Sequence, residues 1–470
     1  MKGPCLDDKI RGANVCKEGI ATKKIKDMLG LDRGQGSNHR PGGQLAHLYA
    51  WIKRYACALG RIFFYALIAA FIGAIVGALD ALFGLGLIAL NHFRDAHPIY
   101  LLPFLGLAGC LIMLVYLRYG GKAQKGMALV FAVGYREDER IPLRMIPLTI
   151  GATWLTHLFG GSAGREGVAV QIGATVANSF SYLLPIKLNP RVVILAGMAA
   201  GFGGLFGTPM AGTFFALEVL VVGSIFYDAL VPALVAAWTA AFTSRALGLE
   251  SFNLGQLEML DIDLQLLLRL IAVGLAFGLV GRMFSLGLFK CRILFANWIP
   301  HPVRRIFIIG TILGIIFLVL DFGRYSGLSN GLFYGALNGG EVYWWDWALK
   351  LILTVVTLAA GFQGGELAPC LVIGASLGVV LGQALGISPA LIAACGACAV
   401  FGAATRTFLA PIFMGVELFG PQVLPYFFIV CMTAHVVAGQ ASIYASQKDL
   451  LDILVGPRSD LDKRLLGKEE

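Results

Sequence analysis

The sequence has few charged residues for its length. Only 37 basic and 28 acidic side chains occur among 470 residues, or 14%, whereas a soluble domain carries about 25%. This scarcity excludes an ordinary soluble globule, and the 57% of hydrophobic residues exclude a disordered chain. Glycine is abundant at 60 of 470 residues, but this is far below the share of about one-third that a collagen requires, so a collagen is excluded. Because glycine is more frequent in membrane helices than in soluble ones, the composition predicts an all-α, polytopic membrane protein.

A long apolar run is missing from the first part of the chain. None begins before about residue 60, so no secretory signal peptide is expected. Residues 1–55 hold more Lys and Arg than Asp and Glu, and the positive-inside rule predicts that this basic tail is cytoplasmic. Much of the net charge of +9 lies in this tail, so nucleic-acid binding is not expected. Residues 446–470 form a short tail of mixed charge, which is also expected in the cytoplasm.

Signatures of common enzymes and metal sites are missing too. The seven histidines show no HExxH or comparable ligand spacing, so no metal is expected. No Walker loop or G-x-S-x-G elbow occurs, so neither an enzyme activity nor a cofactor is predicted. Most of the nine cysteines lie in apolar segments, where buried thiols pack as small apolar side chains. We therefore expect no disulfide framework.

Short apolar segments broken by Gly and Pro gather in two stretches, residues 142–222 and 361–420. These stretches are related in sequence. Phe401 follows Phe202 by 199 residues, and other matching residues keep nearly the same interval. A nearly constant offset across separate segments predicts that the chain consists of two related halves.

The predicted halves are residues 56–250 and 251–445, and we expect two inverted repeats of tilted and broken helices. Paired, Gly-interrupted segments at matching positions of two halves indicate a transporter binding site. A helix that ends in the middle of the bilayer presents free N–H groups and partial positive charge, which suits an anion. The repeat therefore favours an anion pathway, although it does not identify the ion.

Carboxylates inside the apolar segments are few, the main ones being Asp80, Glu166, Glu218, Glu366 and Glu417. An ionisable side chain within a membrane is costly, so a functional role is the first hypothesis. Glu166 and Glu366 each follow a glycine at the start of a short apolar segment, where a carboxylate can mimic a bound anion. Simple capping of a helix is the alternative. Glu218 and Glu417 end their segments, and we expect them to be structural or interfacial.

The motif Gly164–Val168, which reads GREGV, resembles a motif of the CLC family of chloride channels and anion/proton antiporters. Segment Gly364–Pro369 and Tyr444 support the resemblance, which extends from about residue 45 to about residue 455. It implies a homodimer in which each subunit has its own pathway. It also implies that Glu166 is the gate and proton carrier, and that Tyr444 closes the central anion site from the cytoplasmic side.

The resemblance further implies a set of residues around the anion. Glu366 would be the second carboxylate that takes part in transport. The implied anion contacts are Met127, Gly164, Arg165, Gly167, Val168, Gly365, Leu367, Ala368 and Tyr444.

Four departures from the family pattern favour one branch of it. Met127 stands where most members have a Ser that coordinates chloride, and Val168 replaces a Pro. Glu366 is an extra acid near the anion route, and Val219 replaces the second Glu of a pair in chloride/proton exchangers. In these respects the chain is similar to the bacterial fluoride/proton antiporters. A chloride channel or chloride/proton exchanger on the same scaffold is the alternative. A membrane enzyme would need a nucleophile–base pair, and the sequence suggests none.

Fluoride is small and tightly hydrated, so its pathway must replace lost water with strong hydrogen-bond donors. Backbone N–H groups at helix ends can supply them. We expect Met127 and Glu366 to exclude chloride, because a thioether offers a large anion no donor and a protonated carboxyl can donate to fluoride. The expected partners are fluoride (or chloride), protons and membrane lipid. The expected location is the cell membrane, with both termini cytoplasmic.

Overall fold

The computed structural model describes residues 42–137, 140–183, 188–250, 257 and 260–455. The chain divides into two units, Met1–Arg61 and Ile62–Glu470. Most of the predicted basic tail lies outside the described residues, as does the end of the predicted C-terminal tail. The predicted boundaries of the tails and of the two repeats stay predictions.

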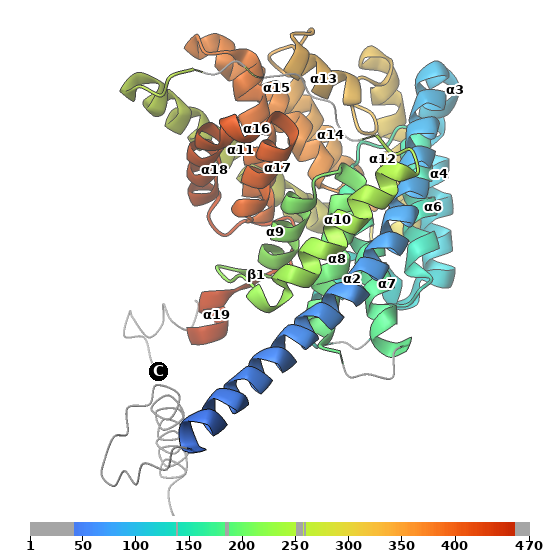
Figure 1. The fold of residues 1–470 in the computed structure, drawn as a ribbon. Helices are drawn as coiled ribbons and strands as arrows, with labels where there is room; N and C mark the ends of the chain where they lie inside the picture. Colours follow the sequence, from blue (N-terminus) through green and yellow to red (C-terminus); the bar gives the residue numbers. More distant parts are fainter. Residues whose placement is uncertain (1–41, 138–139, 184–187, 251–256, 258–259, 456–470) are drawn as a thin grey trace, which may run out of the picture. The chain divides into compact units, whose positions relative to one another are not determined.

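The first half of the chain is built from helices of very different lengths (Figure 1). In chain order they are α2 (Gly42–Ala96), α3 (Pro98–Leu101), η1 (Leu102–Phe104), α4 (Leu105–Val115), η2 (Tyr116–Gly120), η3 (Gly121–Lys125), α5 (Met127–Gly134), α6 (Met145–Leu158), α7 (Glu166–Leu183), α8 (Pro190–Phe206), α9 (Pro209–Val219), η4 (Tyr227–Ala229) and α10 (Leu230–Ala246).

The second half has the same mixture of long and short helices. They are α11 (Leu264–Trp298), α12 (Pro302–Val319), η5 (Asp321–Gly323), α13 (Asn330–Asn338), α14 (Asp346–Ala360), α15 (Leu367–Leu385), α16 (Pro389–Thr405), α17 (Leu409–Phe419), η6 (Pro421–Val423), α18 (Leu424–Ala438) and α19 (Leu450–Val455). Strands β1 (Val221–Val222) and β2 (Lys448–Asp449) form a short parallel pair, which joins the segment after α9 to the segment before α19.

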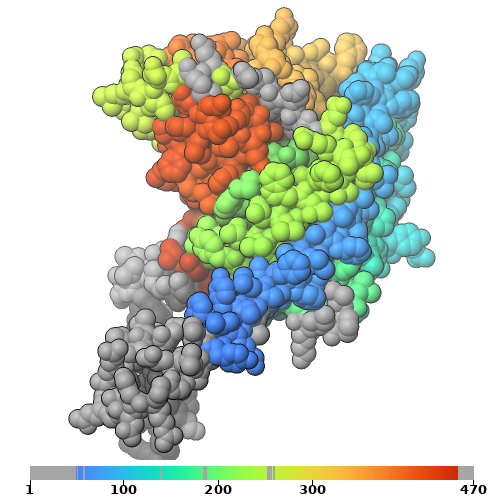
Figure 2. All heavy atoms as spheres, viewed as in Figure 1, coloured from blue at the N-terminus to red at the C-terminus, as the bar shows by residue number. Residues whose placement is uncertain are grey.

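Seven helical segments within the described residues are long and apolar enough to cross a membrane. Large apolar side chains cover their outer surfaces. Figure 2 shows α2 and α10 side by side on one face of the molecule, and on α10 the Phe242 side chain is 76% exposed. Such a surface is stable in lipid and unfavourable in water. The prediction of an all-α, polytopic membrane protein is therefore confirmed.

The elements of the two halves match in order and length. Helices α8 and α16 each have 17 residues and begin at a proline, and α9 and α17 each have 11 residues. Proline suits the first turn of a helix because the missing N–H would have no partner there. The broken helices predicted from the repeated sequence are therefore present in both halves.

Glycines allow the short helices to pack closely in each half. A Cβ atom on Gly173 of α7 would overlap the backbone of Gly197 on α8. The second half repeats this contact, because a Cβ on Gly374 of α15 would overlap the backbone of Gly396 on α16. Helices in lipid associate through such close packing, since lipid tails are as apolar as the side chains. This packing holds α7 against α8 and α15 against α16 in the same way in each half.

Candidate anion site

The starts of α7 and α15 are joined by the residues that precede them. The N–H of Gly164 donates to the carbonyl of Gly365 at 2.6 Å, and the N–H of Gly365 donates to the carbonyl of Gly164 at 2.7 Å. This antiparallel bridge brings together two helix N-termini, one from each half. Both present N–H groups and partial positive charge, so the junction favours an anion.

Glu166 lies at this junction, and its side chain is only 1% exposed. Its Oε2 accepts hydrogen bonds from the N–H of Arg165 at 3.1 Å and from the N–H of Ala368 at 2.9 Å. The Arg165 Nε lies 3.9 Å from Oε1. One carboxylate oxygen thus takes N–H groups from both halves, as a bound anion would. Among the described residues, Oε1 has no hydrogen-bond partner.

A cavity of about 310 Å³ lies next to the junction. Its wall includes four residues predicted from the sequence: Met127, Gly167, Glu366 and Tyr444. They come from α5, α7, the start of α15 and the segment before β2, so the fold brings together residues that are far apart in the sequence. An anion in this cavity would therefore reach the start of α7 at Gly167.

Two polar atoms around this cavity have no hydrogen-bond partner among the residues described. They are the hydroxyl oxygen of Tyr444 and Oε1 of Gln171. A buried polar group without a partner is costly, so it is a candidate for binding something else. The Tyr444 hydroxyl can donate to an anion in the cavity. Phe131 packs against the Tyr444 ring with the centroids 5.3 Å apart and holds it in place.

Glu366 forms an ion pair that the sequence did not indicate. Arg292 of α11 donates from Nη2 to the Glu366 Oε1 at 3.3 Å, and both residues line the cavity. The Arg292 side chain is 46% exposed, so water weakens this pair. An arginine is a good partner for a carboxylate, and it also brings positive charge to the wall of the cavity.

The remaining predicted residues lie in the packed region around the junction. Val168 and Ala368 belong to one apolar cluster, and Leu367 belongs to the main core. Their side chains do not line the cavity. Arg165 is buried beside Glu166. The structure thus brings the predicted residues together, but only part of them face open space.

Sequence reasoning missed two basic residues that the structure places near these segments. Arg292 follows a long apolar run, and its pairing with a residue of another helix left no sequence pattern. Lys350 lies inside the apolar run that became α14 and is completely buried. A lysine within a predicted span is itself a signal of function, and it could have been noticed. No cluster of three or more metal-ligating side chains occurs in the described ranges.

Comparison with known proteins gives consistent results. The family model described as "Voltage gated chloride channel" matches residues 108–439. A chloride/fluoride channel protein of Pseudomonas syringae pv. tomato is 34% identical over 389 residues, which cover 81% of this chain and 85% of that protein.

Solved structures are similar over most of their length. A CLC-type fluoride/proton antiporter is 46% identical and has a TM-score of 0.81, with coverage of 82% of this chain and 98% of that chain. A slow cyanobacterial chloride/proton antiporter has a TM-score of 0.69 at 22% identity and covers 86% of this chain and 99% of its own. The second likeness concerns the fold alone.

Proposed function

The chain belongs to the voltage-gated chloride channel family, and from this premise we propose that it exports fluoride in exchange for protons. Members of this family are anion/proton antiporters or channels, not enzymes. One observation carries the proposal. The Glu166 carboxylate accepts N–H groups from Arg165 in the first half and Ala368 in the second. It therefore occupies the position in which backbone donors of both halves would hold an anion.

In the proposed cycle, Glu166 is both gate and proton carrier. While ionised, it binds the N–H groups at the junction and blocks an anion. A proton removes the charge that these N–H groups stabilise, so the neutral side chain can move away and an anion can replace it. Each proton that reaches Glu166 then frees the site for one anion. Anion and proton consequently move in opposite directions.

Fluoride is the proposed substrate because of the residues around the cavity. Met127 replaces a hydroxyl donor with a thioether, which gives a large anion nothing to bind. Tyr444 and the backbone N–H of Gly167 remain as donors at the cavity wall, and the N–H of Ala368 becomes available when Glu166 leaves it. Similarity to a fluoride/proton antiporter at 46% identity supports this choice. Glu366 would tune the site, as an acceptor for Arg292 when ionised and as a donor to fluoride when protonated.

The setting of transport is part of the proposal. The protein would lie in the cell membrane as a homodimer, surrounded by lipid, with both termini cytoplasmic. One fluoride leaving while one proton enters moves two charges, each worth about 2.3 kcal/mol per 100 mV. A negative interior and an inward proton gradient would then both drive fluoride out.

Flux from liposomes tests the proposal. Purified protein is placed in liposomes loaded with fluoride or with chloride, and anion efflux and internal pH are recorded together at a clamped potential. We expect fluoride efflux with simultaneous proton uptake, and slower chloride efflux. Fluoride efflux without proton movement would make the protein a channel. Faster chloride than fluoride efflux would support the chloride alternative, which shares the same scaffold.

A further inference from the structure

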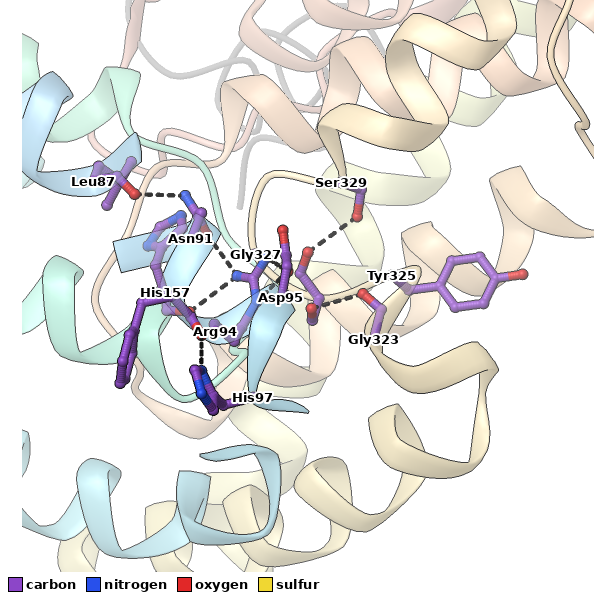
Figure 3. A network of polar contacts seen from close by, with 12 residues as sticks. Leu87, Asn91, Arg94, Asp95, His97, His157, Gly323, Tyr325, Gly327 and Ser329 are labelled. Carbon is purple, nitrogen blue, oxygen red and sulfur yellow. Dashed lines mark hydrogen bonds and ion pairs between the residues drawn. The ribbon is translucent and has the colours of Figure 1, made fainter. Parts of the chain in front are cut away.

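A second cavity, of about 570 Å³, shares no lining residue with the cavity of Tyr444. Its wall includes Asn91 and Arg94 near the C-terminal end of α2, and most of the segment 321–332. Figure 3 shows the Arg94 guanidinium between Asn91 and His157, with the segment that contains Ser329 beside them. The cavity is therefore bordered by a polar network instead of an apolar wall.

Lys350 of α14 is fully buried behind this wall. Its Nζ donates to two hydroxyls, Ser162 and Ser329, each at 2.9 Å. Two carbonyl oxygens lie within hydrogen-bond distance as well, Gly327 at 2.9 Å and Tyr325 at 3.1 Å, so the three N–H groups of the ammonium are shared among four oxygens. None of the ion pairs formed by the described residues includes Lys350. Four oxygens thus replace water around the ammonium, which a buried charge without a counterion requires. Ser162 and residues 325–329 together form a small cation site, which the ammonium of Lys350 occupies.

One of these oxygens belongs to the loop that leads to Glu166. Ser162 lies between α6 and α7, and its hydroxyl also bonds the Thr354 hydroxyl at 2.8 Å. The same loop is held from a second side, because His157 Nε2 bonds the carbonyl of Ala163 at 3.0 Å. Arg94 in turn donates to the carbonyl of His157 at 3.0 Å. Buried polar groups therefore fix this loop immediately before α7 begins.

Helix α14 also leads into the other half of the junction. After α14 ends at Ala360, the chain reaches Gly365, which pairs with Gly164. Through its hydrogen bond to Ser162, Lys350 thus connects the loop 159–165 with α14, the helix that leads to Gly365. Its hydrogen bonds to residues 325–329 link both to the wall of the second cavity. The two N–H groups that hold Glu166 come from these same segments, so a small relative shift would weaken both hydrogen bonds.

We propose that Lys350 is a positioning residue for the gate. Its ammonium is a tethered cation that fastens the loop 159–165 to the segment 323–329, and it thereby holds Glu166 where an anion cannot pass without a proton. This inference rests on the proposed function. Without the ammonium the two segments at the junction can shift relative to each other, which weakens the hydrogen bonds to Glu166. Anions then pass Glu166 without a proton, and the number of protons moved per anion falls.

The test is Lys350→Met, which keeps an unbranched apolar stem and removes the ammonium. Anion and proton fluxes are measured together in liposomes, beside size-exclusion profiles. We expect the protons moved per fluoride to fall by about tenfold or more, as for the loss of a hydrogen bond to a charged group. The control Lys290→Met changes an exposed lysine on α11 and leaves the ratio unchanged. A folded Lys350→Met with the wild-type ratio overturns the proposal.

Refilling the site provides a second measurement. Lys350→Ala lacks three carbons and the ammonium, which n-propylammonium supplies. Ser329 lines the second cavity, so the added cation has a route to the site. We expect n-propylammonium to restore the proton-to-fluoride ratio of Lys350→Ala, whereas n-propanol, which carries no charge, does not. Equal ratios with and without the amine count against a tethered cation.

Two milder variants decide the matter if the Lys350 variants do not fold. Ser162→Ala and Ser329→Ala each remove one of the four oxygens and retain the lysine. A lower ratio in either supports the proposal, and wild-type ratios in both overturn it. The wild-type protein separates this test from the proposed function. If wild type moves chloride and protons instead of fluoride and protons, the fluoride assignment fails, and the role of Lys350 is measured with chloride.

Discussion

Glu218 and Glu417 each cap a helix of the opposite half. The Glu218 carboxylate, at the end of α9, accepts the N–H of Leu409 at the start of α17 at 3.0 Å. The Glu417 carboxylate, near the end of α17, accepts the N–H of Met210 at the start of α9 at 2.8 Å. A negative charge at a helix N-terminus satisfies free N–H groups and complements the helix dipole. The two halves are thus held together by a reciprocal exchange, which agrees with the structural role expected from the sequence.

Removing one of these caps should lower stability without altering transport. We expect Glu218→Ala to lower the free energy of unfolding by about 1–2 kcal/mol, the usual effect of losing an N-terminal cap. Glu417→Ala should have a similar effect because its role is the same. Thermal unfolding in detergent measures the change, and proton-to-fluoride ratios of the folded variants provide the control. An altered ratio at an unchanged melting temperature would assign Glu218 to the transport pathway instead.

The sequence predicted the junction better than its surroundings. The family resemblance pointed to Gly164 and Gly365, which lie 201 residues apart in the two related stretches, and the structure joins them directly. Such a repeat carries three-dimensional information, because equivalent residues of two related halves lie at equivalent places around a common axis. The composition likewise predicted the helical membrane fold, since lipid allows few other solutions.

Contacts between unrelated helices could not be predicted in this way. Arg292 meets Glu366 only because α11 passes the start of α15, and nothing in either segment encodes that crossing. The side chains of Val168 and Leu367 lie in apolar clusters, a placement that the sequence did not indicate, and their expected contact with the anion stays a prediction. Spacing within one helix indicates which residues share a face, but it does not indicate what that face meets.

The role proposed for Glu166 predicts a specific defect. Glu166→Gln keeps the size of the side chain but cannot ionise, so it should neither carry a proton nor hold the N–H groups as an anion does. We expect proton movement coupled to fluoride to disappear. Simultaneous recording of internal pH and fluoride in liposomes checks this. If the variant still moves protons against their gradient when given fluoride, another residue carries them.

Met127 is predicted to contribute to selectivity. Met127→Ser restores a hydroxyl donor in the wall of the cavity, where a larger anion can use it. We expect chloride efflux to rise relative to fluoride efflux, by about a factor of ten if one hydrogen bond to an ion is gained. Met127→Leu is the matched control, because it keeps the apolar volume without adding a donor. Unchanged selectivity in Met127→Ser would remove this residue from the filter.

We predict that Glu366 acts in the coupling of protons to fluoride and that Arg292, its ion-pair partner, acts in anion entry. Glu366→Ala should impair proton-coupled fluoride transport while leaving the size-exclusion profile intact. Arg292→Gln removes positive charge from the cavity wall, and because Arg292 is half exposed we expect only a few-fold rise in the KM for fluoride. Lys290→Gln, an exposed change on the same helix, is the control. Full coupling in Glu366→Ala would exclude this carboxylate from the pathway.

Gly365 is predicted to keep the start of α7 open to an anion. A Cβ atom on Gly365 would lie 2.9 Å from the N atom of Gly167 and 3.0 Å from that of Glu166. Gly365→Ala should therefore cover these donors and reduce fluoride transport severely. Gly364→Ala is the matched control, since its Cβ would crowd the side chain of Ala163 instead of the N–H groups. The measurement is fluoride efflux per folded protein, with thermal unfolding of both variants. Equal losses in both variants would indicate general crowding of the loop, whereas a loss confined to Gly365→Ala would locate the anion at the N-terminus of α7.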